Sequence, residues 1–317
     1  MIANDLEDDV TPLVSIIMNC FNGGEYLSEA IESIISQTYT NWELIFWDNQ
    51  SQDNSAIIIN SYKDKRIRYC YALKHTPLGE ARNLATSMAQ GEWLAFIDCD
   101  DFWDSRKLEL QLNAASKNLN EIGLVYSLFK LKFEKKIEEN GRLFNNYYQT
   151  IRLEPHGPRS IFSELLNGNK IIFSSVLILR SLFDRVGGID SALKQLEDYD
   201  LLIKVASLTS AVCINHQSVT YRIHSSNNSH SQEILSYQEF DRVYSQLPNT
   251  EEIKLVRRKN FTRYGAVLIK KKQFYKGILL VATKGSLPWA CNYCYLKVKD
   301  SFLLFGKNCF NSFMSKF

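Results

Sequence analysis

Short apolar runs alternate with amphipathic segments along the first 115 residues of this chain. Each run is followed by polar residues, so the pattern predicts strands at 13–18, 42–47, 67–71 and 93–98. Apolar positions recur at helical spacing between these runs and predict helices at 27–35, 55–62 and 79–89. Strands that alternate with helices predict an α/β fold with a mainly parallel central sheet flanked by helices.

The pattern is less regular after residue 116. It predicts strands at 124–133, 171–179, 212–215 and 219–223, and helices at 161–166, 181–186 and 196–206. The polar stretch 134–157 has no readable period, and from about residue 232 the pattern is helical and basic. We therefore divide the chain into an acidic arm (1–11), one domain (12–230, with halves at 12–115 and 116–230) and a helical basic C-terminal region (231–317).

Polar residues follow three of the predicted strands. Asn19, Asp48 and the acidic segment 98–101 stand at these positions. Parallel sheets bind ligands beyond the carboxyl ends of their strands, so we expect the chemistry at this edge.

The acidic segment Asp98-Cys99-Asp100-Asp101 is the most informative of these positions. An extended backbone would place Asp98 and Asp100 on one side and Cys99 on the other. Two converging carboxylates favour a hard divalent cation, Mg²⁺ or Mn²⁺, shared with substrate phosphates. The alternative is that they cap a helix starting near Ser105. The segment alone leaves both interpretations open.

The charge is distributed unevenly along the chain. The whole sequence has a net charge of +2, yet residues 254–317 contain 14 Lys and Arg and one acidic residue, Asp300, which leaves −11 for residues 1–253. A basic segment behind an acidic body indicates an anionic partner, either membrane lipid or nucleic acid. No recognisable nucleic-acid-binding module accompanies the basic residues, so we expect no nucleic acid.

The end of the chain has a second membrane signal. Six side chains fall on one side of a predicted helix over 302–317: Phe302, Phe305, Cys309, Phe310, Phe313 and Phe317. Such a basic amphipathic helix could lie on an anionic membrane surface or pack against the domain at 12–230. Seven cysteines without metal-ligand spacing, and no signal peptide or spanning run, predict a cytoplasmic protein, peripheral on the cytoplasmic face of the membrane.

A series of motifs, in order from about residue 13 to 229, resembles the family-two glycosyltransferases, which have a GT-A nucleotide-sugar fold. Their order and spacing together are more specific than any one of them. The motifs are 14–22 with Tyr26-Leu27, 33–38, 47–53, 79–83, 91–101, Gly187-Gly188, 197–201 and 221–224.

The resemblance assigns four residues to the nucleotide sugar: Asn22, Asp48, Arg82 and Asp98. It implies that Asp48 accepts a hydrogen bond from the imide of the base, Arg82 reaches the base or diphosphate, and Asp98 contacts the ribose or sugar. The sequence departs from the family after Asp48, where Asn49-Gln50-Ser51 replaces an acid and Gly-Ser; Asp53 could substitute in part. The alternatives are a turn-capping Asp48 and a surface Arg82 paired with Glu80 or Glu92.

The resemblance also implies a divalent metal. It assigns Asp100 to the metal, Mg²⁺ or Mn²⁺, with His224 as a second candidate ligand for the metal or diphosphate. Asp101 is a secondary candidate, since it is more often structural in the family. A lone histidine is also a common surface or packing residue.

A pair of acids opens the predicted helix at 196–206. The resemblance implies that Asp198 is the general base that deprotonates the acceptor hydroxyl, with Glu197 and Asp200 as secondary candidates. Acidic residues are also common in a first helical turn, where they complement the helix dipole.

The implied function is metal-assisted, inverting transfer of a sugar from a nucleoside-diphosphate sugar, foremost a UDP-sugar, to a glycan or lipid-linked acceptor in bacterial surface polysaccharide synthesis. A sugar-nucleotide pyrophosphorylase would require an Arg-containing glycine-rich loop where 19–24 stands, and a phosphatase of the haloacid dehalogenase type would require Thr or Val at Phe102. A degenerate protein that only binds nucleotide or glycan is the third alternative.

Overall fold

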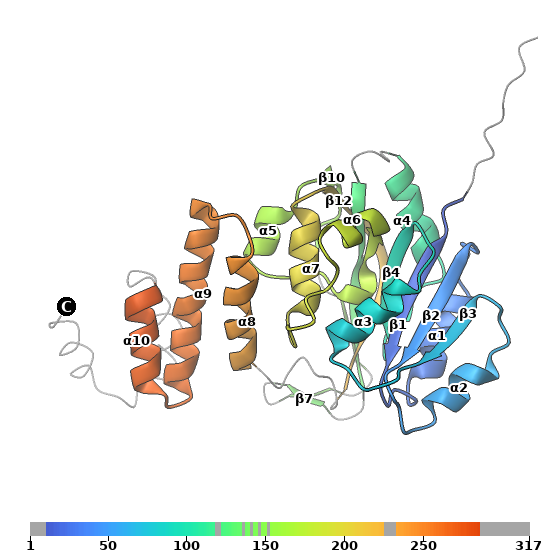
Figure 1. Cartoon of the computed structure of the whole chain (residues 1–317), viewed down its shortest axis with the longest axis horizontal. Helices are drawn as coiled ribbons and strands as arrows, with labels where there is room; N and C mark the ends of the chain where they lie inside the picture. Colours follow the sequence, from blue (N-terminus) through green and yellow to red (C-terminus); the bar gives the residue numbers. More distant parts are fainter. Residues whose placement is uncertain are drawn as a thin grey trace, which may run out of the picture. The chain divides into compact units, whose positions relative to one another are not determined.

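The computed structural model describes residues 11–117, 122–134, 137–139, 142–144, 147–150, 153–224 and 233–285. The chain divides into two compact units, 1–228 and 229–317 (Figure 1). The predicted amphipathic helix over 302–317 and most of the acidic arm lie outside the described residues.

One large mixed sheet forms the first unit. Its strand order is β10-β12-β6-β11-β4-β1-β2-β3, and pairings show that β12, β6, β4, β1, β2 and β3 run in one direction, opposite to β10 and β11. The prediction of a mainly parallel central sheet is therefore confirmed. The strands are β1 (Val14–Cys20), β2 (Trp42–Asp48), β3 (Ile67–Tyr71), β4 (Trp93–Asp98), β6 (Ile122–Phe133), β10 (His156–Arg159), β11 (Leu177–Leu179) and β12 (Ser210–Ile223).

Helices pack on this sheet and leave its carboxyl edge to the loops. They are α1 (Leu27–Ile35), α2 (Ser55–Ser61), α3 (Leu78–Ser87), α4 (Lys107–Ser116), α5 (Phe162–Leu166), α6 (Arg180–Arg185) and α7 (Glu197–Ala206). All lie within a few residues of a predicted helix, and the longer amphipathic ones bury an apolar face at helical spacing. In α1, for example, Leu27, Ala30, Ile31 and Ile34 are buried.

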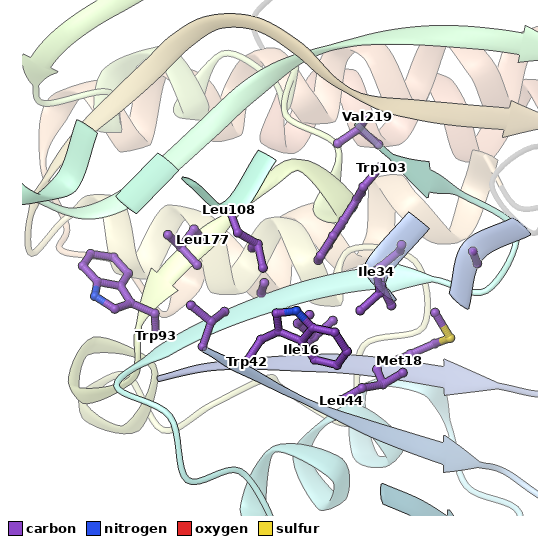
Figure 2. Packing of buried hydrophobic residues seen from close by; sticks show 14 of the residues in the cluster. Ile16, Met18, Ile34, Trp42, Leu44, Trp93, Trp103, Leu108, Leu177 and Val219 are labelled. Atoms are coloured by element: carbon purple, nitrogen blue, oxygen red, sulfur yellow. The ribbon is translucent and has the colours of Figure 1, made fainter. Parts of the chain in front are cut away.

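The main apolar core lies between β1, β2 and β4 and the helices α1 and α4. Figure 2 shows Trp42, Trp93 and Trp103 among its members, and each of these indole side chains is at most 4% exposed. Trp42 and Trp93 are the first residues of β2 and β4, so their burial holds the amino ends of these two strands in the core. The strands from which the polar residues extend are thereby held in one core.

The strand predicted at 171–179 was wrong in its first half. A 3₁₀ helix, η1 (Phe173–Ser175), precedes the short β11. The side chains of α4 hold this turn: Gln111 Nε2 donates to the Ser175 carbonyl at 2.8 Å, and the buried Lys107 donates to Gln111 Oε1 at 2.8 Å. The contact between Gln111 and Ser175 joins residues 64 positions apart, which the apolar pattern cannot predict.

Other differences involve strand length. The strands predicted at 212–215 and 219–223 form one bulged strand, β12, and β1 continues to Cys20 through its pairing with Asp48. The short strands β5 (Phe102–Trp103), β7 (Ile137–Glu139), β8 (Arg142–Phe144) and β9 (Tyr147–Thr150) were not predicted. Strands this short have no measurable period.

The second unit is helical. It contains α8 (Glu233–Ser245), α9 (Glu251–Lys270) and α10 (Phe274–Lys284) in its described part. The Thr250 hydroxyl caps α9 by accepting from the Ile253 amide at 3.3 Å. Among the described residues, no helix combines the length and apolar composition needed to cross a bilayer.

Candidate functional site

The acidic segment forms a tight turn directly after β4. The Asp101 amide donates to the Asp98 carbonyl at 3.1 Å, so the extended backbone ends at Asp98. The alternation predicted for Asp98, Cys99 and Asp100 therefore does not continue through the turn. The carboxylate that bonds the Arg106 amide, at the start of α4, belongs to Asp104 (3.0 Å), so helix capping does not account for the acidic segment.

Arg82 on α3 joins the acidic segment to the first turn of α7. Its guanidinium donates to Asp98 Oδ1 at 2.7 Å and to Glu197 Oε1 at 3.1 Å. The Arg82 side chain is 5% exposed, whereas Asp98 is 39% exposed and opens to solvent. Burial acts to lower the pKa of Arg82, but Asp98 and Glu197 outweigh it and the pKa is raised. The predicted alternative, pairing with Glu80 or Glu92, was wrong.

Asp198 is half-buried beside this cluster. Its Oδ1 accepts from the Tyr199 amide at 2.6 Å. Burial and the negative charge of Glu197 raise the pKa of Asp198 to about 7, against the opposing effect of Arg82. Such a carboxyl group exchanges a proton near neutral pH, which is the requirement for a general base. Asp200 differs: it is fully buried and pairs with Lys204 at 2.6 Å.

Asp100 lies next to His224, which directly follows β12. Asp100 Oδ2 is 3.0 Å from His224 Nε2, and both side chains are partly exposed, at 26% and 13%. The His224 ring packs on Tyr26 with centroids 5.0 Å apart. Within the described part of the chain no three His, Cys, Asp or Glu side chains form a metal cluster. A carboxylate and an imidazole nevertheless suit a divalent cation that takes its remaining ligands from phosphates and water.

Asp101 holds the turn in place from its buried side. It is 1% exposed, its Oδ2 accepts from the Ser174 hydroxyl at 2.5 Å, and its Oδ1 accepts from the Arg222 amide at 3.0 Å. Burial, with the charges of Asp100 and Asp98, raises the pKa of Asp101 well above its usual range. These contacts give Asp101 a structural position rather than one facing a ligand.

Arg222 on β12 holds the other side of the turn. Its Nε donates to the Asp100 carbonyl at 2.8 Å, and its terminal nitrogens bind Glu29 and Glu134. Its side chain is 2% exposed. Sequence reasoning did not give a role to Arg222 or Ser174, because their partners lie more than 70 positions away.

Asp48 lies at the end of β2 and is fully buried. Its carboxylate accepts from the Ser51 amide at 2.7 Å and from the Tyr69 hydroxyl at 3.0 Å. Burial and this hydrogen bond raise the pKa of Tyr69 to about 12. In this conformation Asp48 supports the loop after β2 from the buried side. Contact between Asp48 and a nucleotide base would require that loop to move.

Asn22 ties the loops after β1 and β2 together. Its backbone has a φ of 54°, its amide donates to the Ser51 hydroxyl at 3.0 Å, and its Oδ1 accepts from the Gln52 amide at 2.8 Å. Asp53 reinforces the contact by accepting from the Gly24 amide at 2.9 Å. The two loops thus form one layer at the carboxyl edge of the sheet.

Residues 15–187 match the sequence model of the family described as Glycosyl transferase family 2. The chain belongs to this family. The matched range runs from β1 through α6 and includes Asp98 and Asp100.

Two curated relatives illustrate the likeness. An uncharacterised glycosyltransferase of Rickettsia typhi is 30% identical over 223 residues, which are 69% of this chain and 66% of that protein. The UDP-Glc:alpha-D-GlcNAc-diphosphoundecaprenol beta-1,3-glucosyltransferase WfgD of Escherichia coli is 37% identical over 119 residues, 38% of this chain and 46% of that protein. The chain thus spans less than two-thirds of the length of these relatives.

Solved structures share the fold. The structure of S. aureus TarS 1–349 with UDP-GlcNAc has a TM-score of 0.57 at 17% identity and covers 80% of this chain and 72% of that chain. The mannosyltransferase PcManGT of Pyrobaculum calidifontis, in complex with GDP-Man and Mn²⁺, has a TM-score of 0.57 at 18% identity, with 95% and 82% covered. At these identities the likeness shows the fold, which is GT-A as predicted.

Proposed function

We propose that this protein transfers a sugar from a nucleoside-diphosphate sugar to an acceptor hydroxyl by a metal-assisted, inverting single displacement. One observation supports this most strongly: Arg82 holds Asp98 and Glu197 together, and Asp198 stands beside them with a pKa of about 7. A donor-facing carboxylate and a proton acceptor are thereby joined at one edge of the sheet. The family to which the chain belongs favours the same reaction.

In the proposed reaction Asp198 accepts the proton of the acceptor hydroxyl. The acceptor oxygen then forms its bond to the anomeric carbon while the bond from that carbon to the diphosphate oxygen breaks, and the electron pair leaves with the nucleoside diphosphate. Asp98 orients the donor, and Arg82 keeps Asp98 in place. Because attack and departure occur on opposite faces, an α-linked donor gives a β-linked product.

Asp100 and His224 would hold the divalent cation, Mg²⁺ or Mn²⁺. Their 3.0 Å contact joins an oxygen and a nitrogen ligand, and their partial exposure leaves room for phosphate ligands. The cation, when bound, would stabilise the negative charge on the leaving diphosphate. A structural neighbour was solved with Mn²⁺.

We infer a UDP-sugar as donor and a lipid-linked glycan as acceptor. The E. coli relative is named for UDP-Glc and a diphosphoundecaprenol acceptor, and the TarS structure contains UDP-GlcNAc. Both features fit an enzyme of bacterial surface polysaccharide synthesis. A lipid-linked acceptor and the basic C-terminal region support action at the cytoplasmic face of a membrane.

The test is incubation of the protein with a panel of UDP-, GDP- and dTDP-sugars and Mn²⁺ or Mg²⁺, with analysis of the released phosphates. Metal-dependent release of nucleoside diphosphate is expected. Release of pyrophosphate would instead identify a pyrophosphorylase, and binding without any turnover across donors and acceptors would identify a degenerate binding protein. Either of these results would overturn the proposal.

A further inference from the structure

The second unit carries a basic pocket between α9 and α10 that contains none of the residues assigned to the transferase reaction. The pocket has a volume of about 300 Å³. Its lining comes from one stretch of α9 and the last residue of α10: Lys254, Arg257, Arg258, Phe261 and Lys284. Four cationic residues and one aromatic residue thus line this open pocket.

Glycines determine how closely the two walls of the pocket approach. A Cβ atom on Gly265 would lie 2.8 Å from the Gly277 carbonyl oxygen, and one on Gly277 would lie 2.6 Å from the Gly265 carbonyl oxygen. A Cβ on Gly285 would lie 2.9 Å from the Thr262 hydroxyl. Larger residues would separate the helices, so these glycines bring Lys284 to within 5.1 Å of the Phe261 ring centroid. The cations are therefore held together by helix packing.

Carboxylates neutralise only part of the pocket's charge. Lys254 pairs with Glu251 at 2.7 Å, and Arg257 pairs with Asp241 at 2.7 Å. In the described part of the chain Arg258 and Lys284 form no ion pair, and both are exposed. Two cations therefore remain available to an anion, with two more at the rim.

We propose that this pocket binds a phosphate group, as a monoester or diphosphate. Arginine and lysine together provide a planar fork and point charges, which suit a multiply charged tetrahedral anion. Phe261 provides an apolar wall for the carbon attached to the phosphate oxygen. The pocket volume accommodates a phosphate or diphosphate with part of its substituent. The pocket residues belong to the second unit, whereas Asp100 and Asp198 belong to the first, and the proposal does not depend on the proposed transfer reaction.

The surface of α10 favours a lipid as the source of this phosphate. Phe274, Tyr275, Ile278 and Leu279 are 56%, 79%, 38% and 49% exposed. Their i, i+4 spacing makes one apolar stripe, while Gly277 faces α9. An apolar stripe on the same helix as a phosphate pocket suits a headgroup whose chains enter a bilayer. A free phosphate compound would have no use for this stripe.

Binding to the full-length protein in chelator-containing buffer tests the proposal. Pyrophosphate binding is measured by calorimetry. Lipid binding is measured by pelleting the protein with phosphatidylcholine vesicles that contain phosphatidic acid, or phosphatidylglycerol at equal surface charge. Arg258→Ala and Lys284→Ala test the pocket. Lys259→Ala and Lys276→Ala are matched controls that remove a charge from the same helices outside it.

We expect saturable pyrophosphate binding that weakens about tenfold in each pocket variant and less than about twofold in each control, because a charge-assisted contact contributes roughly 1.4 kcal/mol. Preference for phosphatidic acid vesicles, lost in the pocket variants, assigns the phosphate to a lipid. Pyrophosphate binding without this preference assigns it to a soluble compound.

Two results would overturn the phosphate pocket. One is the absence of pyrophosphate and vesicle binding by the wild-type chain. The other is equal weakening in pocket and control variants, which would indicate diffuse charge. Asp100→Ala should bind pyrophosphate as the wild type does in chelator; a change in affinity there would place the ligand at the catalytic site. None of these results bears on sugar transfer.

Discussion

Two buried arginines flank the acidic turn, and their surroundings differ. Arg82 binds two carboxylates of which one, Asp98, is 39% exposed, and it lies next to the titrating Asp198. Arg222 also binds two carboxylates, but it additionally donates to the Asp100 carbonyl and, through its own amide, to Asp101.

The difference indicates two roles: the Arg82 cluster faces the ligand, whereas Arg222 supports the backbone of the turn. Arg82 acts on side chains, so it can set the charge and direction of groups that meet the donor. Arg222 acts on the backbone of the turn, so it sets where Asp100 stands relative to His224. In the proposed mechanism, donor orientation and proton transfer would therefore depend on Arg82, and metal binding would depend on Arg222.

The largest effect is expected when Asp100, the proposed metal ligand, is removed. Asp100→Ala should lower kcat by on the order of 10³-fold, because metal stabilisation of a leaving group contributes several kcal/mol. Asp104→Ala is the control: it removes a nearby carboxylate paired with His216 at 2.9 Å and should change kcat less than about twofold. Initial rates over a Mn²⁺ series measure both. Full activity of Asp100→Ala in chelator would refute the metal assignment.

Lysine substitutions should separate the two arginines. Lysine keeps the charge but lacks the fork that spans two carboxylates. Arg82→Lys should raise the donor KM about tenfold at saturating metal. Arg222→Lys should weaken apparent Mn²⁺ affinity about tenfold and leave the donor KM at saturating metal unchanged. Identical effects of the two variants on both constants would contradict the division of roles.

The pH dependence of kcat/KM tests the Arg82 cluster, because each neighbour of Asp198 should shift its pKa in a known direction. A base must be ionised, so kcat/KM should fall as the pH drops below about 7, the pKa of Asp198. The charge of Glu197 raises this pKa, so Glu197→Gln should move the midpoint to lower pH. The positive charge of Arg82 lowers it, so Arg82→Gln, which removes that charge, should move the midpoint to higher pH. A midpoint that does not move in either variant would exclude Asp198 as the titrating group.

A small effect is expected at Asp48. Tyr69→Phe removes one hydrogen bond to a buried carboxylate, which should lower the free energy of unfolding by about 1.5 kcal/mol and raise the donor KM only a few-fold. Urea denaturation and donor kinetics measure the two quantities. Tyr71→Phe, on the same strand but exposed, is the control. An equal loss of stability in both variants would argue against support of Asp48 by Tyr69.

Local patterns carried the fold prediction. The strands β1 to β4 and the helices between them follow from short apolar runs and helical spacing, because these patterns are set by residues near one another in sequence. β5 and η1 did not follow: β5 is too short to have a period, and η1 is held by Gln111 from a distant helix. The placement of the acidic segment at a strand end could likewise be predicted.

The partners of the site residues could not be predicted. Arg82 meets Glu197 across 115 positions and Arg222 meets Glu29 across 193, so only the folded chain brings them together. Resemblance to a family gave Asp198 a role, but its raised pKa depends on burial and on Glu197. The roles of Asn22, Asp48, Asp98, Asp100 and His224 stay predictions.

The most direct measurement compares wild type with Asp198→Asn, using donor affinity by calorimetry with Mn²⁺ and single-turnover transfer to an acceptor. The substitution keeps the shape of the side chain and removes the proton acceptor. We predict that donor Kd changes less than about threefold while transfer slows by roughly 10²- to 10⁴-fold, the contribution of a general base. Transfer by Asp198→Asn at the wild-type rate would contradict the account.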